Sequence, residues 1–262
     1  MQVDGDDVPV QVGLLGPLVL EVDGRVVDGL PGRERALLAA LAVRSGHLTT
    51  FADLAEAVWG GSPPDHPRKG LQVLVYRLRR RVGPQVLVTG EDGYTLAVAP
   101  EAVDVHRFEA HVAAARAATD PAVTLDHLDR AMDLWRDEPL IDLGDLDRAR
   151  IERDRLHELR RVAEDERFGA RLALGDHLLV AADLEASLAE DPLRERRWAQ
   201  LMVALHRSGR QADALRAYQR ARVALIESLG VEPGPTLRRL EAAVIAHDPV
   251  LDRGPSPDER SW

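Results

Sequence analysis

The chain of 262 residues contains no cysteine, which excludes disulfide bonds and metal sites built on thiolates. It also lacks any run of 18 apolar residues, so no segment is expected to span a membrane. The N-terminal residues MQVDGDDVPV are acidic and lack the basic-then-apolar order of a signal peptide. We therefore expect a cytoplasmic protein with no membrane partner.

Residue patterns typical of catalysis are missing as well. No G-x-S-x-G, H-E-x-x-H or G-x-x-x-x-G-K-[ST] sequence occurs, so nucleophilic, zinc and phosphate-binding sites have no candidate. The nine histidines are scattered, and His106 and His111 are five residues apart, a spacing that does not place them on one helix face. Both are expected to be surface or partly packed groups. The sequence predicts no enzyme, no metal and no cofactor.

Positive charge is scarce overall but concentrated in one place. The formal net charge is -10, which taken alone argues against a nucleic-acid partner. Residues 1–100 hold 10 basic and 12 acidic residues, whereas residues 101–262 hold 24 and 32. The stretch HPRKGLQVLVYRLRRRVG, residues 66–83, contains six basic residues and no acidic one.

The pattern of the first hundred residues predicts an α+β domain, and the pattern of the rest predicts helices. Residues 10–30 alternate apolar and polar side chains around an Asp-Gly turn, which indicates a small antiparallel sheet. Helical spacing follows in GRERALLAALAVRSG and TTFADLAEAVWGG, the second with Thr49 or Thr50 as N-cap and with Leu54, Val58 and Trp59 facing inward. A second hairpin is expected over residues 86–98. We expect domains at residues 10–100 and 104–250, with disorder at 1–9 and 251–262.

The helical half contains a repeat. A shift of 34 residues aligns Gly175 with Gly209, Val180 with Ala214 and Leu184 with Tyr218, the period of a tetratricopeptide repeat. The alternative is a set of unrelated helical hairpins, because the first copy lacks the tryptophan and the second lacks the closing proline.

The basic stretch has the spacing of a helix with two different faces. One face gathers Leu71, Leu74, Val75, Leu78 and Val82, which predicts a buried stripe. The opposite face carries Lys69, Gln72, Val73, Tyr76 and Arg80. Glutamine can bond adenine, valine can meet a thymine methyl, and arginine can bond guanine or phosphate. This face fits a helix that reads the major groove, and the alternative is an ordinary basic surface helix.

Several segments resemble one family of regulators in sequence order. LLGPLVLEVDGRVV, GRERALLAALAV, LAEAVWG, LQVLVYRLRRRVG and GYTL resemble the OmpR-type winged-helix domain of the Streptomyces antibiotic regulatory proteins, the SARP family. DVHRFE, AMDLWR, the stretch from DPLRERRW to AYQRAR and LGVEPGPTLRRLEAAV resemble the bacterial transcriptional activator domain that follows it, a helical domain expected to be tetratricopeptide-like.

The resemblance implies a transcriptional activator that binds direct repeats in the promoters of secondary-metabolite gene clusters. Its implied partners are double-stranded promoter DNA, a second copy of itself on that DNA, and RNA polymerase holoenzyme including its sigma factor, which would place the protein at the nucleoid. The implied recognition helix is Arg68–Val82 and the implied wing is Val86–Val98. The candidate DNA-binding residues are Arg68, Lys69, Gln72, Val73, Tyr76, Arg77, Arg79 and Arg80, with Thr89, Gly93 and Tyr94 in the wing.

One feature departs from the family's pattern. The tip of the expected wing carries Glu91 and Asp92, although carboxylates are unfavourable beside phosphates. Either the wing stands off the minor groove or these acids face a protein. The alternative function is a tetratricopeptide-like scaffold that binds only proteins and carries a degenerate winged helix.

Overall fold

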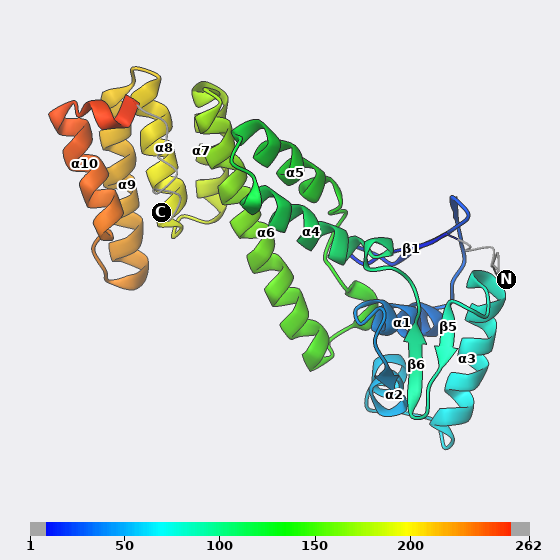
Figure 1. The fold of residues 1–262 in the computed structure, drawn as a ribbon. Coiled ribbons are helices and arrows are strands. Elements are labelled where there is room, and N and C mark those ends of the chain that lie inside the picture. The colour runs from blue at the N-terminus through cyan, green and yellow to red at the C-terminus, as the bar shows by residue number, and fades with distance from the viewer. Residues whose placement is uncertain (1–8, 253–262) are drawn as a thin grey trace. The chain divides into compact units, whose positions relative to one another are not determined.

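The computed structural model describes residues 9–252, which form two compact units. Unit 1 comprises the described residues up to Ala113 together with Arg130–Arg160, and unit 2 comprises Ala114–Asp129 together with the residues from Arg161 onward. Figure 1 labels the elements of both units. The expected disorder at 1–8 and 253–262 falls outside the described residues.

Unit 1 begins with two small sheets and three helices and ends in helical segments. Its elements up to residue 102 are β1 (Val10–Gly13), β2 (Val19–Val22), β3 (Arg25–Val26), α1 (Gly32–Ala42), β4 (Thr49–Thr50), α2 (Phe51–Trp59), α3 (Pro67–Val82), β5 (Leu87–Thr89), β6 (Gly93–Leu96) and the 3-10 helix η1 (Pro100–Ala102). The first sheet is antiparallel in the order β1-β2-β3, and the turn between β2 and β3 has positive φ at Asp23 and Gly24. Two positive φ angles are what a tight Asp-Gly hairpin turn requires, so the expected hairpin is confirmed.

The second sheet, in the order β4-β6-β5, lies beside the three helices and forms the wing. Gly93 pairs with Thr50 at the start of β6, and a Cβ at Gly93 would lie only 2.0 Å from the carbonyl oxygen of Thr49. Only glycine therefore allows β4 to approach β6 at this point. The order of sheet, three helices and hairpin is the winged-helix order expected from the sequence.

Helix α2 begins as expected but packs differently at its end. The side chain of Thr50 caps it by accepting a hydrogen bond from the backbone N–H of Asp53. Leu54 is fully buried, whereas Val58 and Trp59 are only half-buried. The expectation that all three face inward is wrong for the last two. The ring of Trp59 instead covers the first turn of α3, where a Cβ at Gly70 would lie 2.9 Å from it.

A polar bridge connects the first sheet to the helical segments of unit 1. Asp104, 2% exposed, accepts hydrogen bonds from the backbone N–H groups of Leu14 at 2.6 Å and Leu15 at 3.0 Å. Arg136 donates to Asp104 at 3.0 Å and to the carbonyl oxygen of Pro17 at 2.8 Å. Unit 1 therefore extends past the domain boundary expected at residue 100, because these residues satisfy the backbone of the β1–β2 connection.

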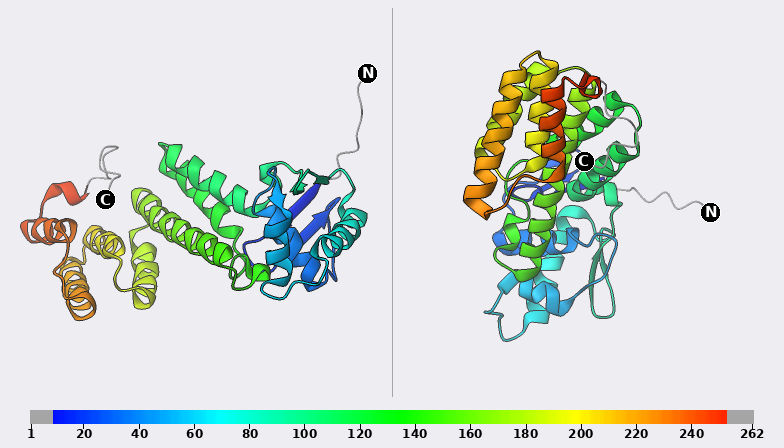
Figure 2. Two further views of the ribbon diagram at one scale, coloured as in Figure 1. Left: turned by 90° about the horizontal axis from the view of Figure 1, so that it is seen from below. Right: turned by 90° about the vertical axis from the view of Figure 1, so that its left-hand side faces the viewer.

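The remaining elements are helical. They are α4 (Asp104–Ala117), α5 (Pro121–Asp133), η2 (Ile141–Leu143), α6 (Asp147–Ala173), α7 (His177–Glu190), α8 (Glu195–Arg207), α9 (Gln211–Leu229), α10 (Pro235–Ala246) and η3 (Pro249–Asp252). In unit 2, α7, α8 and α9 pack in sequence order and α10 lies against α8 and α9 (Figure 2). None of the helices in the described part of the chain combines the length and the apolar character needed to cross a membrane.

The core of unit 2 follows the 34-residue repeat. Val180 and Ala214 occupy equivalent positions and are both fully buried. Leu184 and Tyr218 form a second equivalent pair, of which Leu184 is fully and Tyr218 almost fully buried. Gly175 and Gly209 both have positive φ at the turns before α7 and α9. The repeat is thus reflected in two helical hairpins with matching turns and matching core positions.

Ordered structure reaches slightly further than expected at both ends of the described residues. Disorder was expected at residues 9, 251 and 252. The carbonyl oxygen of Pro9 accepts from the N–H of Asp23 at 3.1 Å. Leu251 is buried, and its carbonyl oxygen accepts from Arg207 at 2.7 Å. The hydrogen bond of Pro9, and the burial and hydrogen bond of Leu251, keep these two residues in the fold, and Asp252 is the last residue of η3.

Candidate nucleic-acid interface

Helix α3 has one buried face and one open face. The five residues of the predicted apolar stripe, Leu71, Leu74, Val75, Leu78 and Val82, are all buried in unit 1. Pro67 stands at its first turn, and the chain leaves the helix at Gly83, whose φ is 92°. Burial of this stripe fixes which side of the helix remains available to a ligand.

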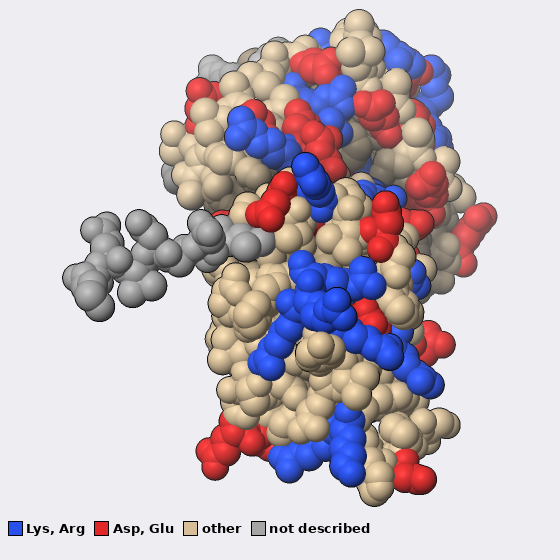
Figure 3. All heavy atoms as spheres, turned by 90° about the vertical axis from the view of Figure 1, so that its right-hand side faces the viewer, with Lys and Arg blue, Asp and Glu red and all other residues tan. Residues whose placement is uncertain are grey.

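The open face carries the residues that the spacing placed there. Lys69, Gln72, Val73, Tyr76 and Arg80 are all exposed. Val73 is 50% exposed and Tyr76 62%, so two large apolar groups stand in solvent among cations. Figure 3 shows Lys and Arg side chains gathered in two groups on this side of the molecule, with acidic side chains at their margins. Such a mixture suits base edges, thymine methyl groups and phosphates.

Four of the six cations of α3 have partners within the protein. The guanidinium of Arg79 donates to the carbonyl oxygen of Leu87 at 2.5 and 2.8 Å and to the hydroxyl of Thr89 at 2.8 Å. These bonds join α3 to strand β5. Arg79 was predicted to contact DNA, and the structure shows it holding the wing.

Glu34 of α1 holds two further arginines. It is 2% exposed, and its carboxylate lies 3.7 Å from Nη1 of Arg77 and 3.6 Å from Nε of Arg81. Oε2 of Glu34 makes no hydrogen bond among the described residues, so these two cations supply its compensation. Nothing in the sequence around Glu34 distinguishes it from a solvent-exposed acid of an amphipathic helix.

Arg68 is held by a ring and a carboxylate. Its guanidinium lies 4.2 Å from the ring centroid of Phe51, and its Nη2 lies 3.3 Å from Oδ1 of Asp92 at the wing tip. Phe51 meets Tyr94 edge-on at 5.5 Å. The sequence left open whether the wing acids avoid DNA or face a protein, and the structure shows that Asp92 pairs with a residue of α3 itself.

Two cations of α3 remain. Among residues 9–252, neither Lys69 nor Arg80 forms an ion pair or a side-chain hydrogen bond, and both are exposed. They are the side chains most available to phosphates.

The predicted wing residues differ in their roles. Thr89 is exposed and accepts from Arg79, whereas Gly93 and Tyr94 are buried. Burial raises the pKa of the Tyr94 phenol above its ordinary value, and the nearby charges of Arg79 and Arg68 partly offset this rise. Gly93 and Tyr94 therefore build the wing from within, and Thr89 is on its surface.

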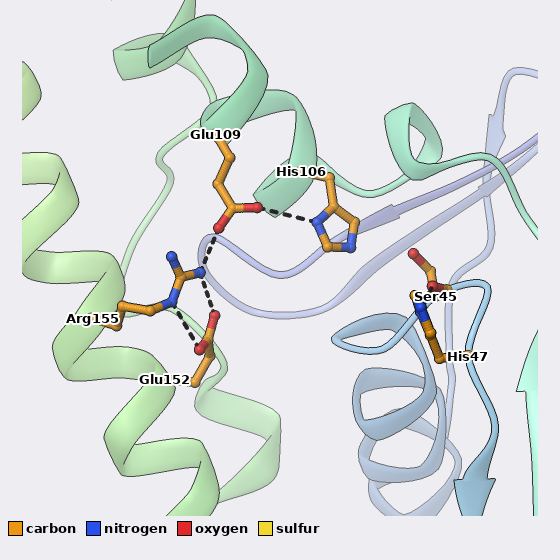
Figure 4. A network of polar contacts seen from close by, with 6 residues as sticks. All are labelled: Ser45, His47, His106, Glu109, Glu152 and Arg155. Carbon is orange, nitrogen blue, oxygen red and sulfur yellow. Dashed lines mark hydrogen bonds and ion pairs between the residues drawn. The ribbon is translucent and has the colours of Figure 1, made fainter. Parts of the chain in front are cut away.

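A second polar cluster in unit 1 joins α4 to α6 and is structural. Arg155 of α6 donates to Glu109 of α4 at 2.5 Å and to Glu152 at 2.6 Å, while His106 lies 3.2 Å from Glu109 (Figure 4). Hydrogen bonds to Glu152, opposed by partial burial, raise the pKa of Arg155 above its ordinary value. In the same view, Nδ1 of His47 lies 3.1 Å from the carbonyl oxygen of Ser45.

Comparison with known proteins assigns both halves of the chain. Residues 28–96 match the family described as "Transcriptional regulatory protein, C terminal". Residues 103–245 match the family described as "Bacterial transcriptional activator domain". The chain belongs to the SARP family of transcriptional activators.

Relatives of this SARP protein match it over nearly its whole length. "Transcriptional regulator RedD" of Streptomyces coelicolor is 36% identical over 252 residues, which cover 92% of this chain and 72% of the relative. "Regulatory protein DnrI" of Streptomyces peucetius is 34% identical, covering 93% of this chain and 95% of the relative. The solved structure "Mycobacterium tuberculosis EmbR in complex with low affinity phosphopeptide" is similar at a TM-score of 0.85 and 33% identity, and the match covers 92% of this chain and 66% of that one.

These matches confirm the resemblance and the fold class drawn from the sequence, an OmpR-type winged helix followed by a helical activator domain. They also confirm the prediction that the protein is a transcriptional regulator and is not an enzyme.

Proposed function

We propose that this SARP protein binds promoter DNA in a sequence-specific manner through α3 and the wing, and activates transcription by recruiting RNA polymerase. The sites would be direct repeats in promoters of a secondary-metabolite gene cluster, occupied by two copies of the chain. The two domains that we propose follow the matched families, the winged helix to about residue 100 and the activator domain from residue 104 to 250.

The observation that carries the proposal is the open face of α3. A helix surface that meets only water usually mixes acids with bases and avoids large apolar groups. Here Lys69, Gln72 and Arg80 stand beside exposed Val73 and Tyr76, and no acid lies on the helix. Cations would neutralise phosphates, while glutamine and valine offer the hydrogen bonds and methyl contacts that distinguish base pairs.

Binding as a pair follows from the small number of available cations. With only Lys69 and Arg80 free of partners among the described residues of α3, one copy would make few phosphate contacts and bind weakly. Two copies on adjacent repeats would gain affinity through effective concentration. Sigma factor and other polymerase subunits would then contact the bound pair, and the helical domain is suited to protein contacts.

The decisive test replaces Lys69 and Arg80 with alanine in the full chain. Neither side chain has an ion pair or side-chain hydrogen bond among residues 9–252, so the fold should be unchanged. The double variant should bind promoter duplexes of the adjacent gene cluster at least about 10-fold more weakly at moderate salt, with a salt slope reduced by about two. Fluorescence anisotropy at several salt concentrations measures both quantities.

The matched control is Arg239→Ala in α10, which removes one exposed cation that also has no partner among the described residues. It should leave the affinity and the salt slope unchanged. If wild type does not bind these duplexes at low salt, or if the α3 double variant binds like wild type, the proposal fails in favour of a scaffold that binds proteins only.

Activation needs a separate measurement. Transcription by purified polymerase holoenzyme from a bound promoter should rise when wild type is added and should not rise with the α3 double variant. A fall in transcription on binding would show that the protein represses that promoter.

A further inference from the structure

The contact between Asp92 and Arg68 is an internal ion pair on the surface that is proposed to meet DNA. Asp92 lies in the turn between β5 and β6, and Arg68 lies in the first turn of α3, at the same end of the unit (Figure 1). Their side chains are 69% and 65% exposed. A phosphate approaching this end of α3 would therefore meet a guanidinium that already has an anionic partner.

Both members of the pair are fixed by neighbouring groups. The guanidinium of Arg68 is stacked on the ring of Phe51, 4.2 Å from its centroid, and at this distance a cation is attracted to the ring. The carbonyl oxygen of Asp92 accepts from the backbone N–H of Phe51 at 3.0 Å, so the wing tip is tied to the same residue. Phe51 thus holds the arginine and the carboxylate beside one another.

Exposure makes the pair weak enough to exchange. Ion pairs in contact with water contribute little to stability, whereas an arginine that forms two parallel hydrogen bonds with a phosphate makes a strong contact. A phosphate held at the correct position can therefore replace Asp92. A phosphate that no base contact positions gains less binding energy from Arg68, because Phe51 and Asp92 hold the guanidinium in place.

We propose that Asp92 is a specificity-determining residue, which withholds Arg68 from the phosphates of unrelated DNA and yields it at a cognate site. Non-specific binding comes almost entirely from phosphate contacts, so it loses most when one cation is withheld. At a cognate site, base contacts made by α3 fix the register of the duplex and place a phosphate where it can displace the carboxylate. This inference rests on the proposed DNA binding and names a residue outside α3 that tunes it.

The neighbouring acid provides a matched control. Glu91 belongs to the same turn, is exposed, and carries the same charge, but it forms no ion pair among the described residues. Asp92→Asn and Glu91→Gln remove the same charge from the wing tip, and only the first releases Arg68.

The experiment uses the full chain as wild type, Asp92→Asn, Glu91→Gln, Arg68→Ala and the Arg68→Ala/Asp92→Asn double variant. One probe is a random-sequence duplex of about 30 base pairs, long enough for a pair of half-sites. The other is a duplex that wild type selects from a random library. Dissociation constants are measured over a series of salt concentrations.

We expect Asp92→Asn to tighten binding to the random duplex by about 3- to 10-fold and to steepen its salt slope by about one, because one phosphate contact is gained. Binding to the selected duplex should tighten by less than about 2-fold, so the ratio of specific to non-specific affinity falls. Glu91→Gln should have a smaller effect on the random duplex. In the Arg68→Ala background the effect of Asp92→Asn should shrink to that of Glu91→Gln.

Equal gains from Asp92→Asn and Glu91→Gln, or a gain from Asp92→Asn that persists without Arg68, would overturn the inference and leave only general repulsion of DNA by the wing. Asp92→Ser, which keeps a small polar turn residue, replaces Asp92→Asn if the latter lowers the melting temperature. Failure of wild type to bind either duplex would instead overturn the proposed DNA binding itself, so the two failures are distinguishable.

Discussion

Helices α3 and α8 each bury an apolar stripe and each carry clustered arginines, but they differ in how buried their cations are. In α8, Arg197 is 5% exposed and donates to Asp165 at 2.6 Å and to Glu164 at 2.9 Å, with a further bond to the hydroxyl of Ser187. In α3, Lys69 and Arg80 remain in solvent with no such partners among the described residues. A helix rich in arginine therefore does not by itself indicate a nucleic-acid surface. Its cations are available to phosphates only where the fold gives them no partner.

The difference follows from what lies opposite each helix. The acids that face α8 come from α6, and they neutralise the buried Arg197 and its neighbour Arg194 just before the helix. Burial disfavours the charge of Arg197, but hydrogen bonds and ion pairs with Asp165 and Glu164 outweigh that cost and raise its pKa above the ordinary value. Among residues 9–252 the open face of α3 is exposed, and acids pair only with arginines at its edges, Glu34 beneath and Asp92 beside.

The largest expected effect comes from breaking the buried pairs of α8. Arg197→Ala leaves Asp165, which is 2% exposed, without one of its two arginines and should destabilise unit 2 by about 3–5 kcal/mol. Urea unfolding followed by far-UV circular dichroism measures the change. Arg196→Ala, a neighbouring cation with no ion pair among the described residues, should cost less than about 0.5 kcal/mol. Equal costs for the two variants would contradict this account.

The next effect concerns the bridge that completes unit 1. Asp104→Ala removes the acceptor of the Leu14 and Leu15 N–H groups and the partner of Arg136, and should destabilise unit 1 by about 2–4 kcal/mol. Hydrogen exchange should show the amides of Leu14 and Leu15 losing protection first. Asp104→Asn keeps one acceptor oxygen and should cost about half as much. Unchanged protection of these two amides in the alanine variant would rule the bridge out.

A smaller effect tests whether α3 reads bases. Gln72→Ala should cost about 1–3 kcal/mol at one base-pair position and relax the preference there, while the salt slope stays unchanged. Arg80→Ala should show the opposite pattern, a uniform loss across sequences with a lower salt slope. Selection from a random duplex library followed by anisotropy separates the two. If both variants change only the salt slope, α3 holds DNA without reading it.

The smallest expected effect is a dependence of stability on pH in unit 2. Burial and the nearby charge of Arg207 lower the pKa of His177 below its ordinary value. The unfolded chain then binds more protons than the folded chain near and below pH 6.5. The contribution of neutral His177 to the free energy of unfolding is therefore complete above that pH and is lost as the pH falls through the folded pKa. His177→Gln should flatten the stability profile between about pH 5 and 7. A profile that the substitution does not change would exclude His177 as its source.

The sequence predicted elements more reliably than partners. All five residues of the α3 stripe are buried and all five residues opposite them are exposed, because a period of 3.6 residues assigns each side chain to a face. Trp59 shows the limit of that reasoning: its spacing indicated the core, but its ring lies on Gly70 of the next helix. The hydrogen bonds of Arg79 to Leu87 could not be predicted either, because helical spacing carries no information about contacts with another element.

What the sequence by itself determined is the order of the elements, the two faces of α3 and the family. These follow from local periodicity, turn residues and motif order, which need no knowledge of distant contacts. Only the tertiary structure decided which cations are available. Glu34 and Asp92 are distant from their arginines along the chain, and packing alone brings them within ion-pair distance. An exposed cation is available to a ligand only when no group of the fold already pairs with it.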